Sequence, residues 1–465
     1  YQENFFENSV LLFSTGDVVF NEEAAHYAMI QHPRPRTVLL IGGGISGTTT
    51  EILKHGVDRI DYVEVNPWIM RIGRYFTASF DDQRVHPVTA DARRFIRETE
   101  ERYDVVLINV PEPTTAQLNR LFTVEFLRDI KEKLNDSGIV SCGLLAQVDY
   151  YGEEARRMAS VLHTTLRQIF PHVLIVPGFR NTFVASDRTL DIHVARLMAE
   201  RHIPAIYVNG YYLDDALLAR RSKEMENTLL AGMPVNTDFR PVAYYRQLLY
   251  WLAYFELSPW IPIIAGLAVL AVIAARLNVV TFGIVIAGFS GSAVEVLLLV
   301  AFQVLYGYVY HLTGLIITMF MAGLAAGAFL QARVWKRGIV SYARIQSLSG
   351  AFCLILPAMF LGLRSVVVPA FATHGVFFAA AFAAAFLVGS QFAVAASLLR
   401  TGAVSAASDL YGLDLLGSAI GAIAVSVVLI PLLGILEVCV VLGVLSLLAA
   451  AVSSLGRKKY LGAGC

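Results

Sequence analysis

The chain has few charged side chains for its length. Asp, Glu, Lys and Arg make up 16% of its 465 residues, whereas 56% are hydrophobic and the mean hydropathy is +0.58. Soluble domains carry about 25% charged residues, so this composition excludes a chain that is soluble throughout. The net charge is also zero, because 37 basic residues balance 37 acidic ones. Without a concentrated positive face, we predict no nucleic-acid partner.

Cysteine is scarce as well. The spacing of Cys142, Cys353, Cys439 and Cys465 matches neither a metal site nor a disulfide framework. Cys353 and Cys439 lie inside apolar runs, where cysteine behaves as a small hydrophobic residue. We therefore expect neither disulfides nor a bound metal.

The balanced total charge hides two unlike halves. Residues 1–257 contain 27 basic and 33 acidic side chains, whereas residues 258–465 contain 10 and 4. Lipid-facing helices avoid charge because it is costly in hydrocarbon. We therefore predict four regions: an α/β domain at 1–190, its completion and an interfacial linker at 191–257, a transmembrane domain at 258–455, and a basic tail at 456–465.

The first region alternates short β-rich runs with amphipathic stretches. The expected strands are Thr37–Ile41, Arg59–Val65, Val85–Thr89, Asp104–Ile108, Ile139–Leu144 and Val173–Val176. Alternation of this kind predicts a parallel sheet with helices on both faces, as in Rossmann-type domains.

The third region contains seven long apolar runs. They are Trp260–Ala275, Val279–Leu305, Leu312–Ala332, Ile345–Leu363, Gly375–Leu398, Leu410–Leu432 and Ile435–Ser454. Most exceed the ~18 residues typical of a membrane-spanning helix, and the first is marginal. The pairs Gly323/Gly327 and Gly417/Gly421 predict close helix packing in lipid. We therefore expect an all-α multi-span domain.

Basic residues in the loops predict the orientation. If all seven runs cross, one side carries nine Lys or Arg and the opposite side carries Arg364. The positive-inside rule places the first side in the cytoplasm. The α/β domain would then lie outside, unless the first run does not cross or another span exists. We expect a cytoplasmic domain on the inner or plasma membrane, because its candidate site suits a cytosolic nucleotide.

That site begins directly after the first expected strand. Gly42–Gly47 has the pattern G-x-G-x-x-G between a strand and a helical pattern, the context in which such glycines admit a ligand to the backbone. Glu64 ends the second strand and can accept both hydroxyls of a ribose, while Asp91 follows the third and can reach an adenine amino group. The alternative is a domain that keeps its glycines for packing and binds nothing.

Several segments carry a resemblance to a known family. They are Phe20–His26, Gly42–Gly47, Val63–Asn66, Phe80–Val85, Ala90–Ala92 and Tyr103–Pro113. In them the chain resembles the spermidine/spermine synthases, or polyamine aminopropyltransferases. The apolar half, at Gly288–Gly291 and Tyr411–Gly421, resembles the multi-span part of membrane-fused spermidine-synthase-like proteins.

The resemblance implies a methyltransferase-like Rossmann fold and a specific reaction. The donor would be decarboxylated S-adenosylmethionine, or S-adenosylmethionine itself, and the acceptor a polyamine; methylthioadenosine would be released. By position, Gly42, Gly44 and Gly47 would line the donor, Glu64 would hold its ribose, and Asp91 would face its adenine.

The chain departs from the family where the acceptor amine would lose its proton. The family's Asp-x-x-Asp-Pro segment corresponds to Asn109-Val110-Pro111-Glu112-Pro113, and Asn109 cannot take a proton. The family's loop Asp is Ile45 here, and its Gln after the fifth strand is Gly143.

Three interpretations of these departures remain open. In the first, Glu112 is the base, with Glu22 or Glu23 nearby, and the acceptor is altered. In the second, the domain cleaves S-adenosylmethionine without an external amine. In the third, catalysis is lost and the domain is a scaffold or sensor.

The apolar half leaves a further alternative and a set of expected partners. Glu295 and Asp414, within the runs, could pair with a cationic amine in a transporter, or could simply form hydrogen bonds between helices. Membrane lipid, a polyamine, and further copies or subunits of a membrane complex are the expected partners.

Overall fold

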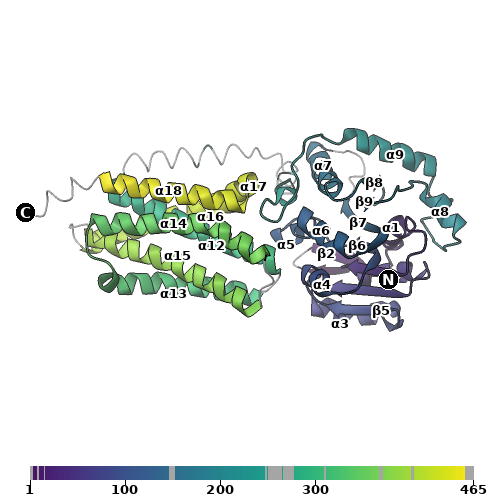
Figure 1. The fold of residues 1–465 in the computed structure, drawn as a ribbon, viewed down its shortest axis with the longest axis horizontal. Coiled ribbons are helices and arrows are strands. Elements are labelled where there is room, and N and C mark those ends of the chain that lie inside the picture. The colour runs from purple at the N-terminus through teal and green to yellow at the C-terminus, as the bar shows by residue number, and fades with distance from the viewer. Residues whose placement is uncertain are drawn as a thin grey trace, which may run out of the picture. The chain divides into compact units, whose positions relative to one another are not determined.

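The structure is a computed structural model. It describes residues 4–7, 10–14, 16–145, 152–246, 249, 264, 266, 277–307, 310–365, 370–398 and 403–455. Contacts divide the chain into two compact units, Tyr1–Tyr254 and Phe255–Cys465. The first unit has a Rossmann-type, methyltransferase-like α/β fold, and the second is all-helical in its described part (Figure 1).

A seven-stranded mixed sheet forms the centre of the first unit, in the order β5-β4-β3-β6-β7-β9-β8. The strands are β3 (Thr37–Ile41), β4 (Arg59–Glu64), β5 (Val85–Thr89), β6 (Tyr103–Ile108), β7 (Leu134–Leu145), β8 (His172–Val176) and β9 (Arg180–Ser186). All six expected strands are present. β3 to β7 run parallel, as predicted.

Two parts of the sheet structure were not predicted. β9 runs antiparallel to both of its neighbours, so the prediction of a wholly parallel sheet is wrong there. Only residues 177–179 separate it from β8, and a parallel return needs a crossover of a dozen or more residues. A separate hairpin, β1 (Asn4–Glu7) with β2 (Val10–Ser14), precedes the sheet.

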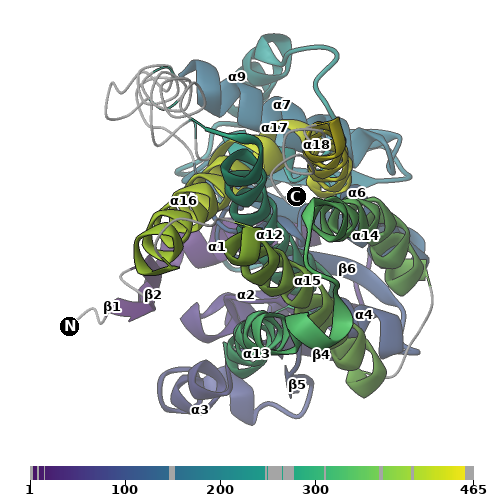
Figure 2. The same cartoon turned by 90° about the vertical axis from the view of Figure 1, so that its left-hand side faces the viewer.

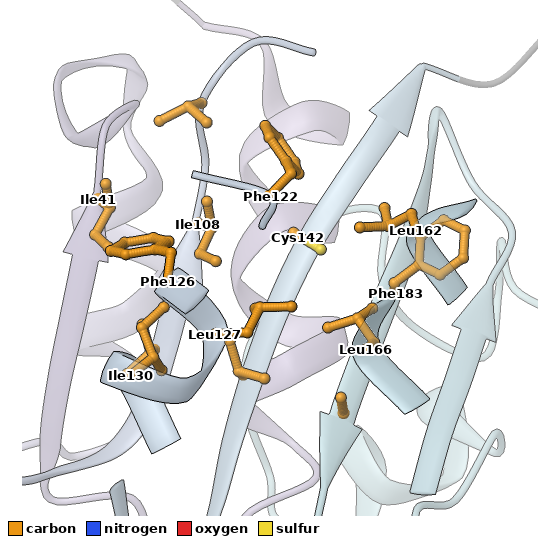
Figure 3. Close-up of a cluster of buried hydrophobic side chains, with 14 of the residues drawn as sticks. Ile41, Ile108, Phe122, Phe126, Leu127, Ile130, Cys142, Leu162, Leu166 and Phe183 are labelled. Carbon is orange, nitrogen blue, oxygen red and sulfur yellow. The ribbon is translucent and has the colours of Figure 1, made fainter. Parts of the chain in front are cut away.

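Helices cover both faces of the sheet, as predicted. The first face packs against α1 (Val18–Met29), α2 (Thr48–Leu53) and α8 (Val194–Glu200). The second packs against α4 (Ala92–Glu98), α6 (Val124–Glu132) and α7 (Glu153–Arg167). Figure 3 shows the core under α6 and α7, where Phe126 and Leu166 lie among side chains of the strands. Burying each such side chain contributes roughly 1.5–3 kcal/mol, so this core holds the strand ends in place.

Further helices and turns belong to the first unit. They are α3 (Pro67–Phe76), α5 (Ala116–Asn119), α9 (Asp215–Thr228) and two 3₁₀ turns, Gly44–Ser46 and Ala78–Asp81.

The second unit contains six long helices among its described residues. They are α12 (Val279–Tyr306), α13 (Tyr310–Val334), α14 (Ile339–Ser365), α15 (Ala370–Leu398), α16 (Ala403–Ile423) and α18 (Ile435–Leu455). The short α17 (Ile430–Leu433) lies between α16 and α18 in the chain. Within the described residues, six stretches are long and apolar enough to cross a membrane. They correspond to six of the seven predicted runs. Of the remaining run, 260–275, only residues 264 and 266 are described, and the tail 456–465 lies outside the described residues.

The predicted glycine pairs bring helix backbones together. A Cβ on Gly417 would lie 2.2 Å from the carbonyl oxygen of Val285, and one on Gly327 would lie 2.2 Å from that of Phe386. α16 therefore packs closely on α12, and α13 on α15; both views place α13 beside α15 (Figures 1 and 2). This confirms the role predicted for the glycines.

Candidate functional site

The predicted site residues gather at the carboxyl edge of neighbouring parallel strands. Backbone hydrogen bonds continue past the strand ends, from Gly42 N to Val63 O (3.0 Å), from Ala90 N to Glu64 O (3.1 Å) and from Asn109 N to Ile41 O (2.9 Å). The strand order reverses between β3 and β6, and open α/β sheets bind ligands at such a point. The main chain thus holds Gly42, Glu64 and Asn109 at one edge.

The glycine bend depends on backbone shapes that favour glycine. Gly42, Gly43 and Gly47 have φ values of 72°, 66° and 121°. A Cβ on Gly43 would lie 2.3 Å from Asn109 Nδ2, which explains how the bend approaches β6 so closely. Gly44 has a packing role, since a Cβ there would meet the Tyr62 ring at 2.6 Å.

Glu64 lies at the end of β4 with its carboxylate held in place. Its Oε1 accepts from the backbone N–H of Asn66 (3.1 Å), and its Oε2 accepts from the Tyr62 hydroxyl (3.3 Å). Each carboxylate oxygen can accept more than one hydrogen bond. The orientation is therefore compatible with the predicted contacts to ribose hydroxyls.

Asp91 has a partner that the sequence did not reveal. Its carboxylate caps α4 at Arg94 N (3.1 Å) and pairs with both terminal nitrogens of Arg120, each at 2.7 Å. Burial alone would raise the pKa of Asp91, but the Arg120 guanidinium outweighs it and holds the pKa below its ordinary value. Asp91 is thus anchored as an anion near the ends of β4 and β5.

A pocket lies on the other side of Asn109, beside β7 and β9. Its empty space is about 360 Å³ when the open solvent at its mouth is included, and the centres of water-sized molecules can occupy about 20 Å³ of it. Its lining residues are Phe20, Glu23, Ala24, Leu107, Ile108, Asn109, Ser141, Cys142, Gly143, Arg180 and Thr182. Asn109 thus separates this pocket from the glycine bend.

Arg180 is the one cation among the described residues that line this pocket. Its guanidinium donates to Asn109 Oδ1 (3.2 Å), Val110 O (3.0 Å) and Gly143 O (2.7 Å). Sequence reasoning missed it because it lies on the unpredicted strand β9. The sequence contains only an indirect indication of Arg180, because Asn109 and Gly143 stand where the resembled family has Asp and Gln.

Glu22 and Glu23, the two acids suggested beside Glu112, have different surroundings. Glu22 accepts the backbone N–H groups of residues 206–208, at 2.6–2.8 Å, and is buried in the fold. Glu23 lines the pocket and accepts from Phe179 N (2.7 Å). Burial raises the pKa of Glu23 to about 7, although the backbone hydrogen bonds lower it. Of these two acids, only Glu23 lines the pocket.

Glu112 lies near the same pocket without lining it. Its Oε1 accepts from the backbone N–H of Leu145 (2.7 Å), and its charge attracts that of Arg180. The structure therefore brings Asn109, Glu112 and Glu23 to one region, with Arg180 between them.

The sequence profile of the spermine/spermidine synthase domain matches residues 18–186. Because of this similarity, residues 18–186 are called the synthase domain below. Over 138 residues the chain is 32% identical to a polyamine aminopropyltransferase of Thermococcus onnurineus, covering 29% of this chain and 49% of that protein. It is 30% identical over 172 residues to a polyamine aminopropyltransferase of Thermotoga maritima, covering 36% and 56%.

The match is confined to this synthase domain. The chain spans about half the length of the curated relatives it matches. Among solved structures, it resembles a spermidine synthase in complex with the transition-state analogue AdoDATO, at 23% identity and a TM-score of 0.42. That likeness covers 49% of this chain and 80% of the other. The synthase domain thus carries the strand edge, the glycine bend and the pocket described above.

Proposed function

We propose that the synthase domain binds S-adenosylmethionine or its decarboxylated form at the glycine bend and transfers the alkyl-amine portion to an amine. The observation that carries the proposal is the backbone register, which places Gly42–Gly47, Glu64 and Asn109 at one strand edge. The domain match supports this class of donor. Gly42 and Gly47 would border the donor, Glu64 would hold the ribose, and Asp91 would face the adenine.

The chemistry is displacement at a carbon bonded to a sulfonium. The neutral amine attacks this carbon, the carbon–sulfur bond breaks, and its electron pair stays on sulfur as methylthioadenosine leaves. The proton of the new ammonium passes to a carboxylate. Glu23 suits this role because a base works best with a pKa near the working pH. Asn109 would orient the amine, and Glu112 is a second candidate base.

The helical unit would anchor this activity to a membrane. Six described helices have the length and composition of membrane spans, and lipid is the partner they imply. We infer that the synthase domain lies in the cytoplasm, where adenosyl donors are made. A polyamine or a related amine would be the second substrate.

The test is release of methylthioadenosine by the purified full-length chain. Each donor is incubated with and without a panel of amines, and Glu64→Gln is compared with Glu98→Gln, which changes an exposed acid of α4. Loss of a charged hydrogen-bond acceptor should weaken donor binding by about ten- to a hundred-fold for Glu64→Gln. Glu98→Gln should leave it unchanged.

The same assay separates the alternatives. Release that depends on an amine supports the transferase. Release without any amine supports an S-adenosylmethionine-cleaving enzyme. Donor binding without release supports a scaffold or sensor, and absence of binding by both donors contradicts the proposal.

A further inference from the structure

The pocket beside Asn109 is built around Arg180. This side chain starts on β9 and reaches across to the carboxyl ends of β7 and β6, where it bonds to Gly143 O, Val110 O and Asn109 Oδ1. Its guanidinium also lies 5.8 Å from the centre of the Phe20 ring. These four contacts, from three segments of the chain, would hold the cation in one place.

Gly143 leaves the space that Arg180 uses. A Cβ on Gly143 would lie 3.0 Å from the Nε atom of Arg180, tighter than ordinary van der Waals contact. Any longer side chain at this position would compete with the guanidinium. Gly143 and Arg180 therefore act as a matched pair in the wall of the pocket.

The Arg180 side chain forms no ion pair within 4 Å among the residues that the structure describes, although Glu23 lines the same pocket. All three oxygens that it contacts belong to neutral groups. Its buried Nε–H has no hydrogen-bond partner among the residues that the structure describes. Glu112 attracts Arg180, and burial lowers the pKa of the guanidinium. Buried ions are normally paired, so a pocket of this kind favours an anion.

The positive charge of Arg180 would also repel the substrates of an ordinary polyamine site. A diamine or triamine carries only positive charges at neutral pH, and bringing them to Arg180 is unfavourable in a partly desolvated pocket. Asn109 supplies no negative charge to offset this; Glu112 does not line the pocket, and Glu23, which does, has its pKa raised to about 7 by burial. A carboxylate, by contrast, matches the planar donor fork of arginine.

We infer that Arg180 binds a carboxylate of the substrate, so that the site takes an amino-acid group in place of a plain polyamine. This inference rests on the proposed function. The carboxylate can come from the donor, if that is intact S-adenosylmethionine, or from an acceptor amino acid. Both sources present the same chemistry to Arg180.

The reaction balances for either source. With intact S-adenosylmethionine, an amine nitrogen bonds to the methylene carbon next to sulfur, and the carbon–sulfur electrons leave with methylthioadenosine. The transferred group is then 3-amino-3-carboxypropyl. With the decarboxylated donor, the amino group of an amino acid attacks in the same way and receives an aminopropyl group. In both cases one proton passes to the Glu23 carboxylate.

Calorimetric binding to the detergent-purified full-length chain tests the donor source. Methylthioadenosine, S-adenosylmethionine and its decarboxylated form are each titrated into the wild type, Arg180→Gln, Arg180→Lys and Arg220→Gln, the last an exposed arginine of α9. We expect the wild type and Arg220→Gln to prefer S-adenosylmethionine over the decarboxylated form by about ten- to a hundred-fold. Arg180→Gln should lose this preference and Arg180→Lys should reduce it. Methylthioadenosine, which lacks the amino-acid end, should bind all four alike.

Turnover with the decarboxylated donor tests the acceptor source. If both donors bind equally, methylthioadenosine release should be faster with amino acids than with diamines, and Arg180→Gln should remove the difference. Equal donor binding together with faster turnover of diamines, unaffected by Arg180→Gln, overturns the inference. Failure of the wild type to bind methylthioadenosine instead contradicts the proposed function. If Arg180→Gln does not fold, and so binds no methylthioadenosine, the comparison rests on Arg180→Lys.

Discussion

Glu22 and Glu23 are neighbours in the chain with different tasks. Three backbone N–H groups hold the Glu22 carboxylate as part of the fold, whereas Glu23 lines the pocket with a pKa near 7. Sequence reasoning could suggest both acids but could not choose between them, because the choice depends on residues 178–180 and 206–208, far along the chain. The residues that follow strand ends, Gly42, Glu64 and Asp91, were easier to foresee because parallel strands bring their carboxyl ends together.

Glu23→Gln tests the proposed base through pH. The carboxyl accepts a proton only when ionised, so turnover of the wild type should rise with pH and level off above about 7. Glu23→Gln should abolish this rise and lower the rate by roughly 10²–10⁴-fold. The measurement is methylthioadenosine release between pH 5.5 and 9, taken at about half-unit steps. If Glu23→Gln retains the rise of turnover with pH and Glu112→Gln loses it, Glu112 is the base instead.

The same carboxyl links pH to stability. Its folded-state pKa, about 7, lies above the ordinary value of 4.5, so the folded chain holds the proton more tightly than the unfolded chain does. Stability should therefore fall as pH rises from about 4.5 to 7 and stay flat above, a loss of about 3 kcal/mol. Glu23→Gln should lack this contribution when thermal unfolding is compared at both ends of the window.

Among the elements, the segment after α9 belongs firmly to the first unit. Asp238 accepts from both terminal nitrogens of the buried Arg93 on α4 and from the Thr123 hydroxyl at the start of α6 (2.7 Å). Asn236 donates to Phe122 O (3.0 Å). The Asn, Asp and Pro residues of this segment are typical of a turn, but a buried ion pair across 145 positions has no local signature.

Breaking this ion pair should destabilise the first unit strongly. Arg93→Met leaves the fully buried Asp238 without its counter-charge, which costs about 3–5 kcal/mol. The double variant Arg93→Met/Asp238→Leu removes both charges and should recover much of that loss. Thermal unfolding of the full-length chain is the measurement. Equal stability of the single variant and the wild type would show that the pair contributes little.

Helix α16 offers a matched pair of glycines. Gly417→Ala places a Cβ 2.2 Å from Val285 O, so α16 must move away from α12, whereas Gly412→Ala meets nothing within 4 Å. We expect Gly417→Ala to lower the melting temperature in detergent by several degrees and Gly412→Ala to leave it unchanged. Similar melting of the two variants would contradict the packing described here. The glycine spacing predicted this contact, but only the structure identifies the partner helix.

At the scale of the whole molecule, the division into two units was readable from the distribution of charge. The zero net charge arises from an acidic half and a sparsely charged basic half. The sequence boundary between the two units falls near the position where the charge changes. Six long apolar helices match six of the predicted runs because length and hydropathy are properties of the sequence alone. Orientation is different, since it depends on whether residues 260–275 cross.

Cysteine labelling in cells tests the orientation. Cys142, Cys353 and Cys439 are buried, so Cys465→Ser provides a background of low reactivity. Tyr211→Cys, in the exposed part of the first unit, should react with a membrane-impermeant maleimide only after permeabilisation. Arg364→Cys, on the opposite side, should react in intact cells. Labelling of Tyr211→Cys in intact cells would place the synthase domain outside and make residues 260–275 a span.

The proposed function requires that an adenosyl group binds at the glycine bend. Its most direct test is an experimental structure of the full-length chain with S-adenosylmethionine added. We predict density for the nucleoside against Gly42–Gly47, with the ribose hydroxyls at Glu64 and the adenine near Asp91. The proposed function is contradicted if, at saturating ligand, Tyr62, Ile45 or other side chains of the chain itself fill the bend and no nucleoside is found there.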